Sequence, residues 1–171
     1  MYTAARFFCW IFPDLQRLEA LAVGCCLAVL ITLFHVTILN QIMSWYRKKS
    51  QQLLASGKLS GVAPLLSFST TILLMLLLHV LDSGIWGCVL WTMRLIPNLH
   101  DAFYFSANTY TSLGYGNMIL SPDWRELSPL IAISGLFTFA CTTGQLFTVM
   151  GYHRGNVDDL KAKREQKDSS T

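Results

Sequence analysis

Three long apolar stretches restrict what this chain can fold into. They cover approximately residues 20–43, 65–96 and 130–150. A hydrocarbon core roughly 30 Å thick needs about 20 apolar residues of helix, so each stretch is long enough to cross a membrane. The composition agrees, because 53% of the 171 residues are hydrophobic and 13% are charged, which is atypical of a soluble domain. We therefore predict an all-α membrane protein with three transmembrane helices.

The basic residues predict the orientation of these helices. They crowd the loop after the first stretch and the carboxyl-terminal tail: Arg47, Lys48, Lys49 and Lys58, and Arg154, Lys161, Lys163, Arg164 and Lys167. Cytoplasmic segments of membrane proteins carry an excess of lysine and arginine. We therefore expect the loop and the tail in the cytoplasm and the amino terminus outside, in the inner or plasma membrane of a cell.

The sequence between the second and third stretches predicts a short helix over residues 99–110. Pro97 ends the second stretch, and Asn98 and Asp101 suit the first turn of a new helix. Free N–H groups and the helix dipole favour oxygen acceptors and negative charge at that end. Such a helix is roughly 18 Å long at 1.5 Å per residue, so it reaches only part of the way through a bilayer.

The short helix leads into a glycine-containing string, Thr109-Tyr110-Thr111-Ser112-Leu113-Gly114-Tyr115-Gly116-Asn117. Over about residues 101–150 the chain resembles the pore module of tetrameric potassium channels, close to compact prokaryotic members with one extra N-terminal span. The usual pattern there is Thr-Val-Gly-Tyr-Gly-Asp. This chain departs from it at Ser112, Leu113 and Asn117.

The resemblance implies a re-entrant pore helix and a selectivity-filter loop, with four copies closing one homotetrameric pore. K+ would bind the Ser112 hydroxyl and backbone carbonyl oxygens, because glycines allow dihedral angles that aim carbonyl groups at one axis. The implied filter comprises Thr111, Ser112, Leu113, Gly114, Tyr115 and Gly116, with K+ contacts at the middle four. Tyr104, Asn108 and Asn117 would support it, the two asparagines as an amide pair where relatives carry carboxyl groups.

The third stretch carries polar residues at helical spacing: Ser134, Thr138, Cys141, Thr142 and Gln145. We interpret this face as the lining of a hydrated pore, because an unpaired amide in lipid is costly. Bonds to the helix's own backbone or packing against neighbours are the alternative. Gly135 and Gly144 interrupt the same helix, either as gating hinges or as sites of close helix packing.

The second stretch carries two ionisable residues, His79 and Asp82, with Trp86 four residues further on. Ionisable groups at membrane depth are costly and commonly functional. A local hydrogen bond between the histidine and the aspartate would satisfy both. Alternatively, the two form a pH-sensitive pair that braces the outer helix against the pore helix, since histidine titrates near neutral pH.

These patterns divide the chain into five segments. We expect an extracytoplasmic segment over residues 1–19, with an interfacial aromatic patch that ends at Pro13, and a first transmembrane helix over 20–46. A cytoplasmic loop over 47–63, a pore domain over 64–151 and a cytoplasmic tail over 152–171 follow.

The predicted function is passive, potassium-selective conduction across the lipid bilayer by a homotetramer. A weakly selective monovalent cation channel, or a non-conducting regulatory membrane protein with a pore-like fold, is the alternative. Catalytic and nucleotide-binding motifs are missing from the sequence, which argues against an enzyme, and nothing in it suggests a nucleic-acid partner, a small-molecule substrate or a cofactor besides permeant K+.

Overall fold

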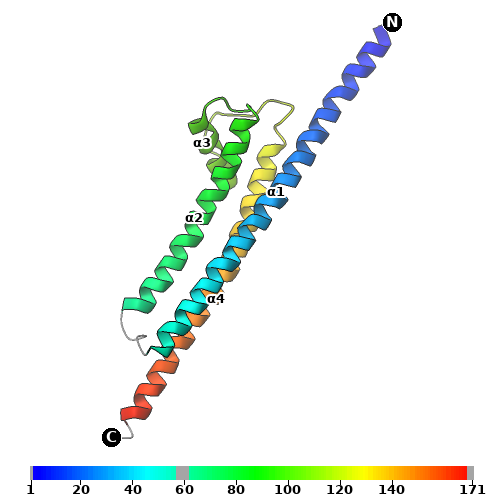
Figure 1. Cartoon of the computed structure of the whole chain (residues 1–171). Helices are drawn as coiled ribbons and strands as arrows, with labels where there is room; N and C mark the ends of the chain where they lie inside the picture. The colour runs from blue at the N-terminus through cyan, green and yellow to red at the C-terminus, as the bar shows by residue number, and fades with distance from the viewer. Residues whose placement is uncertain (1, 57–61, 169–171) are drawn as a thin grey trace. The chain divides into compact units, whose positions relative to one another are not determined.

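The computed structural model describes the backbone of residues 2–56 and 62–168, and the side-chain burial of residues 18–56 and 63–155. Its described part contains four helices, α1 (Tyr2–Ala55), α2 (Val62–Thr92), α3 (Leu99–Tyr110) and α4 (Leu127–Asp168), and no strand (Figure 1). The predicted all-α fold is therefore confirmed.

Segments of α1, α2 and α4 are long and apolar enough to cross a membrane, namely Leu18–Ala55, Ala63–Thr92 and Leu127–Gly155. Many leucines on these segments are exposed, among them Leu33, Leu66, Leu77 and Leu136. Exposed apolar side chains in such number suit contact with lipid rather than water. The chain is thus a multi-pass membrane protein, as the apolar stretches predicted.

The first and last helices, α1 and α4, are longer than expected. Helix α1 begins at Tyr2 and runs through Pro13, where a break was predicted, and it continues to Ala55 through most of the expected loop. Proline removes one hydrogen bond from the ladder and crowds the preceding turn, yet the long helix continues through it. Residues 47–55 are mostly good helix formers without glycine or proline. Helix α4 likewise continues into the predicted tail, through Gly155 to Asp168. The remainder of the predicted loop, residues 57–61, lies outside the described residues.

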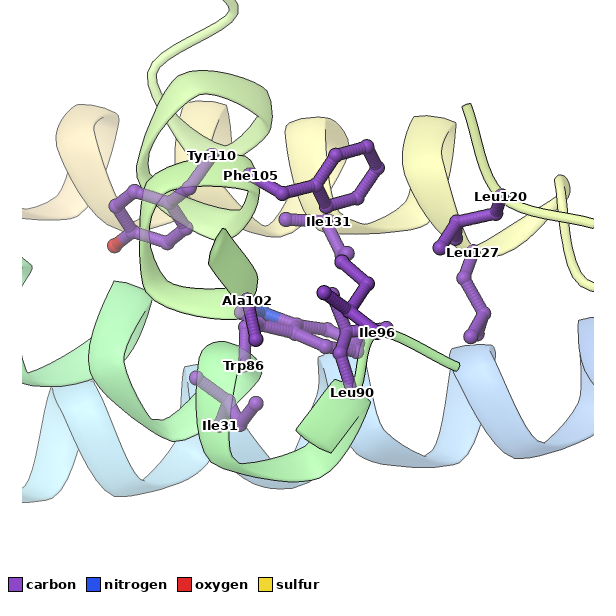
Figure 2. Close-up of a cluster of buried hydrophobic side chains, with 10 residues drawn as sticks. All are labelled: Ile31, Trp86, Leu90, Ile96, Ala102, Phe105, Tyr110, Leu120, Leu127 and Ile131. Atoms are coloured by element: carbon purple, nitrogen blue, oxygen red, sulfur yellow. The ribbon is translucent and has the colours of Figure 1, made fainter. Parts of the chain in front are cut away.

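One compact unit comprises Met1–His35 and His79–Phe139. Its core collects apolar side chains from all four helices and the flanking loops: Ile31, Trp86, Leu90, Ile96, Ala102, Phe105, Tyr110, Leu120, Leu127 and Ile131. Ala102, Phe105 and Tyr110 of the short helix belong to this cluster, whose side chains Figure 2 shows. The burial of these side chains fixes α3 against the longer helices.

Helix α3 also approaches α2 closely. A side chain at Gly87 would place its Cβ 3.1 Å from the Cα of Phe103. Only a small residue allows two helix backbones to approach to this extent. Gly87 therefore helps to set the position of the short helix within this unit.

The second compact unit comprises Val36–Leu78 and Ala140–Thr171. Its core is formed by Leu39, Ile42, Met43 and Tyr46 of α1, Met75 and Leu78 of α2, and Val149 of α4. The guanidinium carbon of Arg47 lies 5.4 Å from the centre of the Tyr152 ring, a cation–π contact. The buried positions of α1 recur every three or four residues, which is the spacing of one helical face.

Candidate functional site

The short helix begins and ends where its sequence predicts. Asn98 is the N-cap, with φ −97° and ψ 127°, and its side-chain oxygen accepts a hydrogen bond of 3.0 Å from the backbone N–H of His100. Asp101 lies in the first turn, where the helix dipole favours a negative charge. Local capping chemistry therefore determines the start of α3.

The carboxyl end of α3 is Tyr110, which is buried, and Thr111 caps it. The Thr111 backbone N–H donates to the Ala107 carbonyl at 3.0 Å, and its hydroxyl donates to the same oxygen at 2.7 Å. The carbonyl groups of Asn108 and Thr109 accept hydrogen bonds from N–H groups of the loop that follows. Their partial negative charge is favourable for a cation near this end of the helix.

The backbone after α3 alternates in handedness. Ser112 has φ 56°, Gly114 has φ 70° and Gly116 has φ 123°, so every second residue lies in the left-handed region. Glycine adopts such angles without a steric penalty, whereas serine is strained there. Successive carbonyl groups of a strand with uniform dihedrals point to opposite sides, and a change of sign at alternate residues is what turns them towards one side.

Asn108 anchors the loop through its backbone. Its carbonyl oxygen accepts hydrogen bonds from the N–H groups of Leu113 at 2.9 Å and Gly114 at 3.4 Å. Its side-chain amide donates to the Tyr104 carbonyl at 2.9 Å. The Asn108 amide thus bonds within its own helix, and the amide pair expected between Asn108 and Asn117 stays a prediction.

The loop itself is open to its surroundings in the single chain. Tyr115 is 71% exposed and Leu113 is 56% exposed, and a Cβ at Gly114 would have no atom within 4 Å. Tyr104 is also exposed, and a Cβ at Gly116 would lie 3.7 Å from its ring. One chain therefore supplies the loop but leaves its side chains without a packing partner.

Two of the residues expected to line a pore are buried inside the chain instead. Ser134 accepts a hydrogen bond of 3.0 Å from the Trp86 indole N–H, and Thr138 lies 2.5 Å from the Tyr110 hydroxyl oxygen (Figure 2 shows Trp86 and Tyr110). Both hydroxyls also donate to carbonyls of α4. The pore-lining interpretation is thus wrong for Ser134 and Thr138, because the face that they share is directed at α2 and α3.

The remaining three members of the predicted stripe, Cys141, Thr142 and Gln145, are partly exposed. They belong to the second unit, where Cys141 packs against the buried cluster. Their exposed surface is compatible with contact with water. The assignment of these residues to a pore lining stays a prediction.

The two glycines of α4 differ in their surroundings. A Cβ at Gly135 would lie 2.0 Å from the Tyr110 carbonyl oxygen, which no side chain can accommodate. A Cβ at Gly144 would have no atom within 4 Å. Close packing accounts for Gly135 in this structure, whereas Gly144 has no packing requirement among the described residues.

A polar cluster lies beside the end of α3. His35 of α1 is 0% exposed, and its Nδ1 donates to Asp82 Oδ2 at 2.5 Å. The Tyr110 hydroxyl donates to the same carboxylate oxygen at 3.0 Å, and His79 Nδ1 lies 3.2 Å from that hydroxyl oxygen. The Phe139 ring stacks on the His79 ring with centroids 4.0 Å apart.

Sequence reasoning missed His35. It named His79 and Asp82 as a pair, yet the partner of Asp82 comes from another helix, 47 residues away. The rule that draws attention to ionisable residues at membrane depth applies equally to His35 in the first stretch. That rule was the available signal, although it does not indicate which residue pairs with which.

Three apolar helices long enough to cross a membrane, a short helix capped between two of them, and a loop of alternating backbone handedness define the described part of this membrane protein. Residues 74–152 match the family described as "Ion channel". The predicted recognition of a channel pore module is thereby confirmed. No curated protein and no solved structure matches the chain.

Proposed function

We propose that this channel is selective for potassium and conducts K+ passively through the backbone of residues 111–116. The observation that carries the proposal is the alternation of positive φ at Ser112, Gly114 and Gly116, directly after the carboxyl end of α3. Backbone carbonyls directed at one axis can replace the hydration shell of K+. The dipole of α3 adds a favourable potential for a cation at that point.

The channel is proposed to be a homotetramer with α3 as a re-entrant pore helix. Irregular backbone at membrane depth requires protein or water around it, and the exposure of Tyr115 and Leu113 supports a neighbouring subunit as the missing partner. A filter made from one loop per chain needs four copies, and cyclic symmetry closes the ring.

In the second compact unit, Cys141, Thr142 and Gln145 of α4 are proposed to line a hydrated cavity, and Gly144 is the proposed hinge. Their partial exposure and the open space around Gly144 support these roles. The amino terminus is placed outside and the carboxyl terminus in the cytoplasm, as the distribution of lysine and arginine indicates. Ions would then enter the filter loop from the outer side.

A weakly selective cation channel is the second candidate. The departures at Ser112, Leu113 and Asn117 favour it, because the strained Ser112 and the absent carboxylate alter the two ends of the filter. Bilayer recordings with purified protein in K+ against Na+ distinguish the candidates. A reversal potential near the K+ equilibrium value supports selectivity for potassium, equal permeability supports the second candidate, and no flux contradicts both.

A further inference from the structure

The helix outside the family match is connected to the pore loop by buried polar contacts. The match begins at residue 74, so α1 is an addition to the segment that defines the family. Nevertheless, His35 of α1 is completely buried and hydrogen-bonds Asp82, which lies inside the matched segment. A buried hydrogen bond to a carboxylate is not expected of a helix that merely packs on the periphery.

The contact continues across all four helices. His35 and Tyr110 both donate to Asp82 Oδ2, at 2.5 and 3.0 Å, and the Tyr110 hydroxyl lies 2.5 Å from the hydroxyl of Thr138. We call these four residues the His35–Thr138 network. Each helix contributes one of its members, and each member is buried within the same compact unit.

Tyr110 is the point at which this network meets the pore loop. It is the last residue of α3, so Thr111 and the strained Ser112 follow it directly. Its ring is held through the hydroxyl, and its carbonyl lies against Gly135 with no room for a Cβ. Because Tyr110 is held at both ends, a displacement of its ring would be transmitted to the first residues of the loop.

A metal ion is a less suitable occupant of this cluster than a proton. One donor atom each of His35, His79 and Asp82 lies within 4.8 Å of the others. However, His35 Nδ1 and Asp82 Oδ2 are only 2.5 Å apart, whereas two tetrahedral ligands at about 2.0–2.1 Å from zinc are separated by roughly 3.4 Å. The direct hydrogen bond therefore occupies the space that the metal would need.

We propose that His35 is a positioning residue for the filter, and that α1 acts on ion selection through Asp82 and Tyr110. This inference rests on the proposed function. The carboxylate of Asp82 has two donors, the imidazole of His35 and the hydroxyl of Tyr110, and both bond Oδ2. Its other oxygen, Oδ1, has no partner among the described residues. Without His35, the buried carboxylate must draw on other donors, and Tyr110 is the nearest.

The test compares His35→Leu with Ile31→Ala in purified channels in bilayers, using the K+/Na+ permeability ratio from reversal potentials. Ile31 is buried in the same core one turn earlier on α1, so its truncation removes packing but leaves the network intact. His35→Leu is expected to lower the ratio by about tenfold, the effect of one hydrogen bond to a charged group. Ile31→Ala is expected to reduce the yield of folded protein without changing the ratio.

Two further variants keep the inference testable if His35→Leu does not assemble. Tyr110→Phe removes only the hydroxyl and is expected to lower the permeability ratio as His35→Leu does. His35→Asn keeps a donor near the position of Nδ1, so its ratio is expected to lie between those of His35→Leu and the wild type. A selective wild type whose ratio is unchanged in both His35→Leu and Tyr110→Phe would overturn the inference and leave the proposed function intact. A non-selective wild type would instead contradict the proposed function.

Discussion

A methyl group on Gly135 would lie 2.0 Å from the carbonyl oxygen of Tyr110. This distance is far inside van der Waals contact, and the obstructing atom belongs to the backbone at the end of α3. Gly135 therefore lets α4 lie against the residue that immediately precedes the pore loop. The same helix has no such restriction at Gly144.

Gly135→Ala is expected to destabilise the folded channel by about 1–3 kcal/mol or more, because overpacking forces the backbone of α3 or α4 to move. Thermal denaturation of the purified protein in detergent measures this effect. Gly144→Ala is the matched control and should leave the denaturation temperature almost unchanged. Equal stability of the two variants would show that Gly135 is not needed for packing.

Ser134→Ala is expected to cost about 1 kcal/mol of stability, since it removes the hydrogen bond from the Trp86 indole. It should not change single-channel conductance, because Ser134 is buried inside the chain rather than facing a pore. Denaturation and single-channel recording of one preparation check both statements. A clear change in conductance without loss of stability would restore the pore-lining interpretation of this residue.

Accessibility to thiol reagents tests the proposed cavity. In a background without native cysteines, Thr142→Cys and Gln145→Cys should react with a charged reagent applied from the cytoplasmic side, and the current should fall. Thr138→Cys is the control and should not react, because Thr138 is fully buried. Modification of Thr138→Cys at the rate of the other two would contradict the arrangement of α4.

The pH-sensitive brace expected from His79 and Asp82 stays a prediction. The groups that face His79 are His35 on α1, Asp82 on α2 and Tyr110 on α3, whereas Phe139 of α4 does not titrate. A protonated His79 would place a positive charge beside the imidazole of His35, which donates to Asp82. The current should therefore fall as acid protonates His79.

Asp82→Asn should abolish this pH dependence, because it removes the carboxylate that is bonded to His35 and to the Tyr110 hydroxyl beside His79. His100→Ala is a suitable control, since the side chain of His100 is 88% exposed. Currents are compared over the same pH range for all three proteins. An identical pH profile in Asp82→Asn and wild type would exclude the brace.

Local signals predicted the site more accurately than long-range ones. Pro97, Asn98 and Asp101 act within a few residues of one another, and α3 accordingly has the predicted bounds. The periodic polar residues of α4 correctly indicated a shared face for Ser134 and Thr138, but spacing alone does not say what that face contacts. The burial of both residues shows that this face is directed at α2 and α3.

The His35–Asp82 contact could not be predicted from spacing at all. The two residues are 47 positions apart, and sequence periodicity relates only residues on the same helix. Likewise, Pro13 is a local helix breaker that the rest of α1 overrides. Pairing between helices depends on tertiary packing, which a single sequence does not specify.

The central claim is that the backbone of residues 111–116 selects K+, and Gly114→Ala tests it most directly. Gly114 has φ 70°, which alanine adopts only with strain, and a Cβ there would meet no atom within 4 Å in the chain. The substitution therefore acts on the loop backbone with little effect on the subunit's packing. In bilayers with K+ and Na+ on opposite sides, the wild type should reverse near the K+ equilibrium potential, and Gly114→Ala should lose the K+ current. A current of unchanged size and reversal potential in Gly114→Ala would contradict the account.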